Sequence, residues 1–157
     1  MKKIFCSLML FVFMTTAFAQ KITEKDLSGT WKLTAFEANG MTINYKTSDI
    51  ILSPKMKEKY GDKAETFRKM MVEELKKNKP KQQELFFEDG IKVIFRKENE
   101  EPLSWHYYIF EKEGVEYLQM NGGDFMMTMS GKALVLSGKE GDGMEIIMTY
   151  EKTSEKK

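Results

Sequence analysis

From Thr30 onward, apolar and polar residues alternate along short stretches with the period of two that is typical of β-strands. Gly29 stands before the first stretch, 30–37, and allows the backbone a tight entry into it. The alternation puts Phe36 largely on the polar side of this strand. The apolar face carries Trp31, Leu33 and Ala35.

Further stretches with strand character follow, and short turns such as Asn39-Gly40 separate many of them. Successive strands joined by tight turns usually pair as antiparallel neighbours, and a long meander removes its free edges by closing. The sequence therefore predicts a mostly β fold, a small antiparallel up-and-down barrel of about eight strands. The predicted strands after the first are 41–45, 83–88, 91–97, 103–111, 115–120, 124–130, 133–137 and 144–151.

A helical segment interrupts this run of strands. Ser53 and Pro54 form a strong helix start, because a capping hydroxyl precedes a proline that fits the first helical turn. Gly61 breaks the helix, and Asp62 begins a second one that runs to about Lys77. We therefore expect a helix-turn-helix inserted after the first strand or hairpin.

Apolar residues at spacings of three or four give this segment one apolar stripe that must be buried. Because the barrel is the only large apolar surface that the predicted strands offer, we expect the segment 54–77 to form a two-helix cap over the open barrel end, where it would gate access. The lid residues predicted to face inward are Phe67, Met71 and Leu75.

The first 19 residues have the three-part form of a secretory signal peptide. Lys2 and Lys3 precede an apolar run from Ile4 to Phe18, and Ala19 ends a small-x-small cleavage site. The run is shorter than the roughly 20 residues that cross a bilayer. We expect cleavage after Ala19, leaving a barrel domain at 20–152, a polar tail at 153–157 and no membrane span. The mature protein would be exported to the periplasm or secreted.

Composition narrows the chemistry. The 157 residues are 41% hydrophobic and 31% charged, which suits one globular domain. The single cysteine, Cys6, lies in the leader, so the mature chain has no thiol for catalysis, a disulfide or a metal site. Removal of Lys2 and Lys3 leaves 23 of the 25 basic residues against 24 acidic residues, a net charge of about −1 that does not favour nucleic acid as a partner.

The step Gly29-x-Trp31 at the head of the first strand resembles the opening signature of the lipocalin-like (calycin) barrels of small exported bacterial proteins. The resemblance implies a barrel that binds a small hydrophobic molecule, with a helical turn at 22–28 closing one end. It also implies a structural role for Gly29 and a buried, structural Trp31 at that end. Lipocalins usually stack an arginine after the last strand on this tryptophan, and here Lys152 is the available substitute. Their Thr-Asp-Tyr motif is absent.

The helix-turn-helix after the first strand is also similar to the lid of the intracellular fatty-acid-binding barrels. Those barrels carry an Arg-x-Tyr carboxylate clamp on the final strand. Met148 precedes Tyr150 by two residues here, so the resemblance does not extend to a fatty-acid site of that type.

Candidate catalytic chemistry is sparse. His106 is the only histidine, and it has no second histidine or mature cysteine as a partner for metal binding or nucleophilic catalysis. The glycine-rich turns lack the residues of a phosphate-binding loop or a calcium loop. We therefore expect a protein that is not an enzyme and that has no catalytic residues, no metal site and no cofactor.

The candidate ligand site is the barrel interior, where alternation gathers methionine and aromatic side chains. An eight-stranded barrel is either just filled by side chains or holds one small ligand. Two functions follow: a carrier or sensor of a small apolar molecule, or a protein-interaction or inhibitory module with a filled barrel. The inward choice of Trp105 and Tyr107 over His106 and Tyr108 depends on register, which a one-residue slip reverses. The predicted ligand-binding residues are Phe95, Trp105, Tyr107, Met127, Met129, Met148 and Tyr150.

Overall fold

The computed structural model describes residues 21–78, 80–88, 90–141 and 143–153. The leader predicted at 1–19 and most of the predicted tail lie outside these residues. The elements are, in order, α1 (Glu24–Leu27), β1 (Gly29–Ala38), β2 (Met41–Asn44), β3 (Asp49–Leu52), α2 (Pro54–Tyr60), η1 (Gly61–Lys63), α3 (Ala64–Lys77), β4 (Gln83–Glu88), β5 (Lys92–Lys97), β6 (Leu103–Lys112), β7 (Val115–Met120), β8 (Gly123–Ser130), β9 (Ala133–Glu140) and β10 (Met144–Lys152).

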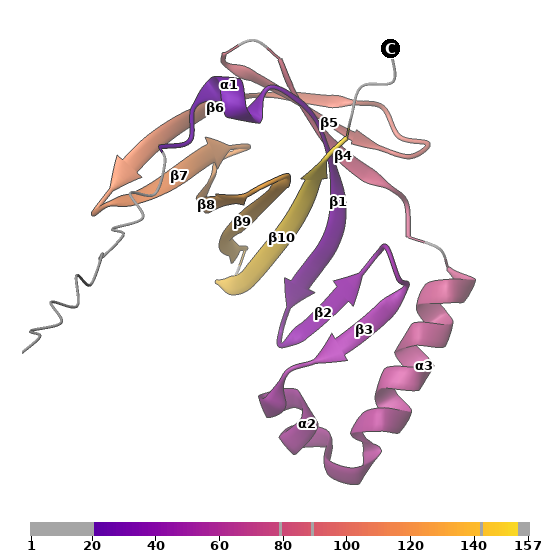
Figure 1. Ribbon diagram of the computed structural model, residues 1–157. Coiled ribbons are helices and arrows are strands. Elements are labelled where there is room, and N and C mark those ends of the chain that lie inside the picture. The colour runs from indigo at the N-terminus through magenta and orange to yellow at the C-terminus, as the bar shows by residue number, and fades with distance from the viewer. Residues whose placement is uncertain (1–20, 79, 89, 142, 154–157) are drawn as a thin grey trace, which may run out of the picture.

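Eight of these strands form a closed antiparallel barrel (Figure 1). Strands β4 to β10 pair in sequence order, β4 pairs with β1, and β10 returns to pair with β1 along most of its length. The closure leaves no free barrel edge. The predicted up-and-down barrel of about eight strands is confirmed.

Strand β1 changes partners in its middle, and a β-bulge marks the change. Its first half pairs with β4 and its second half pairs with β2. The pairing with β10 shifts between Leu33 and Ala35, so that Thr34 is the extra residue. The shift places Phe36 opposite Met148 and turns it toward the barrel interior. The prediction that Ala35 faces inward and Phe36 outward is therefore wrong, because strict alternation does not continue through a bulge.

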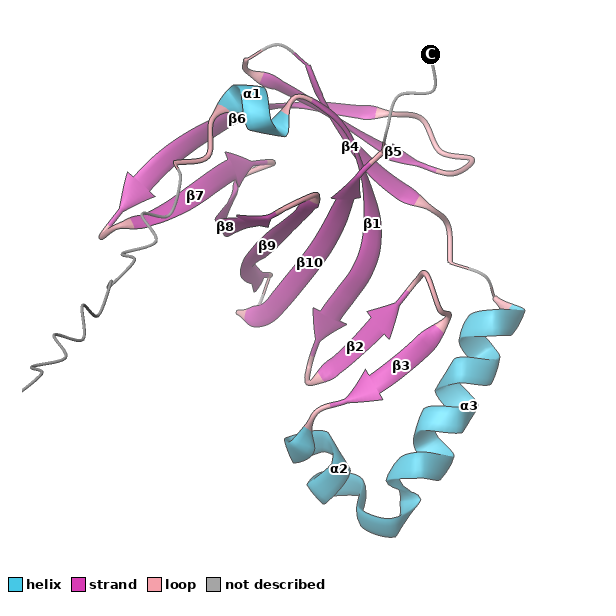
Figure 2. Cartoon of the chain, in the orientation of Figure 1, coloured by secondary structure: helices cyan, strands magenta, loops and turns pink. Residues whose placement is uncertain are grey.

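The helices do not cover the barrel. Figure 2 shows α2 and α3 beside the hairpin of β2 and β3, away from the barrel strands. Strand β3 was not predicted, and it carries the buried side chains Ile50 and Leu52. The predicted lid residues pack against this second cluster: Phe67, Met71 and Leu75. The insertion is confirmed, after three strands, but its predicted position over the barrel mouth is wrong because the hairpin supplies the apolar surface.

Helix α1 closes one end of the barrel. Its last residue, Leu27, is fully buried, and its carbonyl oxygen accepts a 2.6 Å hydrogen bond from Nε1 of Trp31. Trp31 itself is fully buried in the main core cluster. Ahead of the helix, the backbone N–H of Ile22 donates to both carboxylate oxygens of Glu116 at 2.9 and 3.0 Å. The structure thus places Trp31 at the closed end. None of the described helices is long and apolar enough to cross a membrane.

Candidate functional site: a cavity at the open end of the barrel

A cavity of about 640 Å³ lies at the barrel end opposite α1. It lies between the second half of β1, the starts of β4 and β6, and the turns that join β7 to β8 and β9 to β10. Several lining side chains are only partly buried, which opens the cavity to solvent. The apolar lining residues are Leu33, Phe36, Leu85, Phe95, Leu103, Trp105, Met120, Phe125, Ile146 and Met148.

All seven predicted ligand residues lie in or against the main core cluster. The structure brings four of them to the cavity wall: Phe95, Trp105, Met148 and Tyr150. The other three are nearer the closed end and do not line it: Tyr107, Met127 and Met129. The barrel is therefore filled by side chains toward α1 and hollow toward the open end. It combines the two predicted alternatives, a filled interior and an interior that holds a ligand.

The register of β6 follows the prediction. Tyr107 is 1% exposed and Trp105 lines the cavity, whereas His106 points outward and Tyr108 is 59% exposed. The ring of Trp105 stacks on Phe95 of the neighbouring strand, with centroids 5.5 Å apart and planes 21° apart. Such a stacked pair gives the wall a large, rigid apolar surface.

Two glycines keep the ring of Phe125 against the wall. A Cβ at Gly138 would lie 2.7 Å from Cδ1 of Phe125, and a Cβ at Gly123 would lie 3.1 Å from the same ring. Neither distance is compatible with an unmoved ring. Because glycine has no side chain, Gly123 and Gly138 leave a recess that holds the Phe125 ring, and the space in front of the ring stays open.

Two tyrosine hydroxyls are among the polar groups of the cavity. Tyr150 is 2% exposed, and its hydroxyl donates a 3.4 Å contact to the Sδ of Met148, a weak acceptor. Tyr45, which follows β2, also lines the cavity, and its backbone N–H donates to the carbonyl oxygen of Thr34 at 2.9 Å. Burial raises the pKa of both phenols above the usual value of 10.0. Both hydroxyls are thus neutral at physiological pH.

Gln83 and Asn121 add side-chain amides to the lining. Of the lining residues that the structure describes, Lys139 alone is charged, and it lies near the open end of β9. Lys139 lies three residues after the buried Leu136 and therefore on the opposite, outer face of β9. It is paired in register with the exposed Glu145 on that face. Charge is thus confined to the cavity rim, while the interior is apolar with neutral hydrogen-bonding groups.

One buried hydroxyl near the closed end has no hydrogen-bond partner among the described residues, that of Tyr107. The ring of Phe87 packs edge-on against Tyr107, with centroids 5.1 Å apart. Burial raises the pKa of Tyr107, and the nearby Glu24 carboxylate raises it further. An unpaired buried hydroxyl weakens the fold, because it has lost water without gaining a partner.

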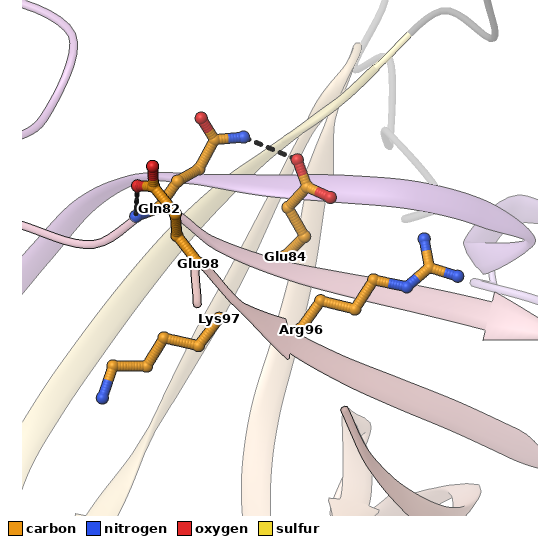
Figure 3. Close-up of a pocket in the computed structure, with 5 residues that line it drawn as sticks. All are labelled: Gln82, Glu84, Arg96, Lys97 and Glu98. Carbon is orange, nitrogen blue, oxygen red and sulfur yellow. Dashed lines mark hydrogen bonds between the residues drawn. The ribbon is translucent and has the colours of Figure 1, made fainter. Parts of the chain in front are cut away.

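A smaller hollow of about 330 Å³ lies on the outer face of β4 and β5 (Figure 3). Its side chains carry balanced charges, and Nε2 of Gln82 donates to Oε1 of Glu84 at 2.6 Å. The guanidinium of Arg96 stacks over the ring of Phe86, 4.8 Å from its centroid. Residues of opposite charge that are already engaged and solvated make this hollow a poor ligand site.

Within the described ranges, no group of three or more His, Cys, Asp or Glu side chains could hold a metal ion. The outward His106 lines a surface hollow beside Phe86 and Lys92.

Sequence reasoning missed several lining residues, above all Tyr45 and Phe36. Tyr45 shares a face with Met41 and Ile43 in the alternation, so its inward position had a signal, but its contact with the barrel depends on where β1 exchanges partners. Phe36 had no such signal, because nothing in the local sequence announces the bulge at Thr34.

Comparisons with known proteins give little beyond the fold. No protein-family model matches the chain, and no curated protein matches it. Among solved structures, the chain is similar to Echinococcus granulosus fatty-acid-binding protein 1, with a TM-score of 0.43 and 17% sequence identity over 83% of this chain and 99% of that chain. At this level the likeness does not bear on function.

Proposed function

We propose that this protein is a non-enzymatic carrier or sensor that binds one small apolar molecule in the open half of its barrel. We also propose that it is an exported, distant relative of the lipocalin-like barrels, as the leader and the Gly29-x-Trp31 step suggest. The observation that carries the proposal is the cavity: about 640 Å³ falls within the usual range of ligand sites, roughly 300 to 1,000 Å³.

The character of the walls supports an apolar ligand. The stacked pair of Phe95 and Trp105 faces the space with Met148 and Phe125, and few polar groups interrupt them. Burial of apolar ligand surface against such walls gains about 25 cal/mol per Å². Methionine adapts its shape easily, which suits a site that accepts related molecules.

Ligand entry does not require the helices to move. No residue of α2 or α3 lines the cavity, and both helices pack on β2 and β3. The open end is therefore the entrance, and exchange is limited by the ligand's contacts with the walls. The cavity also favours the carrier over an interaction module with a filled barrel.

Native mass spectrometry of the exported protein tests the proposal. We expect an intact chain that begins at Gln20, together with a bound species of a few hundred daltons that organic extraction removes. The Met148→Lys variant, prepared in the same way, should lose the bound species because it places a charge in the wall. Absence of any bound species, together with no uptake of added Nile red, would contradict the carrier function.

A further inference from the structure

The polar groups that line the cavity interior share one property, which is that they carry no charge. Tyr45 and Tyr150 offer hydroxyls and Gln83 offers an amide, while the exposed Asn121 adds a second amide at the open end. Among the described residues that line the cavity, there is no arginine and no carboxylate. Lys139 is at the rim, on the outward side of β9 and in register with Glu145.

The backbones of the two tyrosines lie beside one stretch of the barrel wall. Tyr150 is paired in register with Leu33, and the residue after Leu33, Thr34, accepts the backbone hydrogen bond of Tyr45. Tyr150 has only the weak acceptor Met148 Sδ as a partner, at 3.4 Å. Its hydroxyl can therefore exchange that contact for a better hydrogen bond to a ligand at little cost.

A charged head group would be poorly accommodated at this position. A carboxylate brought to Tyr150 would lose its water without meeting a cation, and an ammonium group would meet no anion. Burial keeps both tyrosines protonated, so they can donate to and accept from a neutral group. A hydroxyl, amide or ester oxygen fits these partners.

We propose, on the basis of the carrier function above, that the ligand is an uncharged amphiphile whose neutral head group hydrogen-bonds to Tyr150 and Tyr45 while its apolar body lies against Phe95 and Trp105. The site thereby selects fatty alcohols, amides or similar neutral lipids over free fatty acids and cationic amphiphiles.

Displacement of Nile red by amphiphiles with the same dodecyl chain tests this selection at about pH 8. We expect dodecanol and dodecanamide to displace the dye at concentrations about tenfold or more below those of dodecanoate and dodecyltrimethylammonium, each used below its micelle concentration. Dodecanoate should improve as the pH falls toward about 5, because its protonated form is the one that fits.

The Tyr150→Phe variant keeps the ring and removes the hydroxyl, so it should retain dye affinity and weaken displacement by dodecanol and dodecanamide, which narrows their advantage over the charged amphiphiles. Tyr108→Phe, on the exposed side of the barrel, is the matched control, and Tyr45→Phe replaces Tyr150→Phe if the latter fails to fold. Unchanged discrimination in the folded variant would refute the placement of the head group at Tyr150.

Two other outcomes separate this inference from the function on which it rests. If dodecanoate competes as well as dodecanol, the neutral ligand class is wrong while the carrier function stands. The same holds if dodecanoate competes better than dodecanol and Lys139→Ala abolishes this advantage. If the dye does not bind the wild-type protein and no amphiphile does, the carrier function itself fails.

Discussion

The ammonium group of Lys152 lies 5.3 Å from the centroid of the Trp31 ring. The same nitrogen donates a 2.9 Å hydrogen bond to the carbonyl oxygen of Asp26 in α1. One side chain thus joins the last strand, the first strand and the helix that closes the barrel. Lys152 was the expected substitute for an arginine stacked on Trp31, and it makes that contact.

Replacement of Lys152 by methionine should weaken the closed end. We expect the free energy of unfolding to fall by about 1 to 2 kcal/mol, since a cation–π contact and a charge-assisted hydrogen bond are lost. Lys152→Arg should retain most of the stability. Urea denaturation followed by circular dichroism measures the effect, with Lys112→Met as the exposed control. Equal stability of Lys152→Met and the wild type would show that the contact does not hold the end closed.

Much of the fold could be predicted from the sequence, because most strands carry an uninterrupted alternation. Tyr107 and Met127 were predicted to face inward, and both are almost completely buried. The alternation fails where the strand contains a β-bulge, because the pattern of apolar and polar side chains does not indicate where a bulge occurs. Thr34 is the extra residue of a β-bulge, and this bulge reverses the faces of Ala35 and Phe36. The Thr34 hydroxyl donates to the carbonyl oxygen of Thr149 at 3.1 Å.

The helical insertion shows a different limit. The apolar stripe of the helices indicated that they are buried, but it did not indicate the surface that covers them. That surface includes β3 at Asp49–Leu52, which is too short for an alternation of apolar and polar residues to be recognised. Once β3 exists, the hairpin offers Ile50 and Leu52 as a core for the helices. Arg68 fixes the arrangement further, with Nη1 2.7 Å from Oδ1 of Asp49 on β3.

The cavity could likewise not be predicted from the sequence, because its volume depends on how far the core side chains fill the barrel.

Tyr107→Phe should stabilise the protein. The variant removes a buried hydroxyl that lacks a partner among the described residues and keeps the edge-on contact with Phe87. We expect the free energy of unfolding to rise by up to about 1 kcal/mol. Thermal denaturation by calorimetry is the measurement. A loss of stability would mean that the hydroxyl has a partner that the structure does not show.

Gly138→Ala tests the recess behind Phe125. A strand glycine replaced by alanine usually gains about 0.5 to 1 kcal/mol, but here the new Cβ would meet the ring at 2.7 Å. We therefore expect a loss of about 1 to 3 kcal/mol from overpacking. Phe125→Leu in the same chain should restore part of it. Ser137→Ala, on the outward side of β9, is the control, and a stabilised Gly138→Ala variant would argue against the recess.

Alkaline pH should destabilise the protein through its buried tyrosines. The pKa values of Tyr45, Tyr107 and Tyr150 are all raised above 10.0 in the folded state. Above about pH 10 the unfolded chain releases phenolic protons that the folded chain keeps, so stability falls as the pH rises, by up to about 1.4 kcal/mol per pH unit for each tyrosine. Tyr150→Phe should reduce this slope in urea titrations between about pH 10 and 12. A slope equal to that of the wild type would show that Tyr150 ionises freely in the fold.

The most direct test of the interior site compares two adjacent positions on β10. Met148 lines the cavity, whereas Ile147 is 37% exposed on the outer side. A lysine at each position adds the same charge to the same strand. Circular dichroism and thermal denaturation establish that both variants are folded.

Titration with Nile red then measures the affinity of the wild type and the two variants. A site inside the barrel predicts that Met148→Lys weakens dye binding by about tenfold or more, because the ammonium group and its water occupy the cavity, while Ile147→Lys binds as the wild type does. Equal dye affinity in wild type and folded Met148→Lys would contradict a ligand site in the barrel.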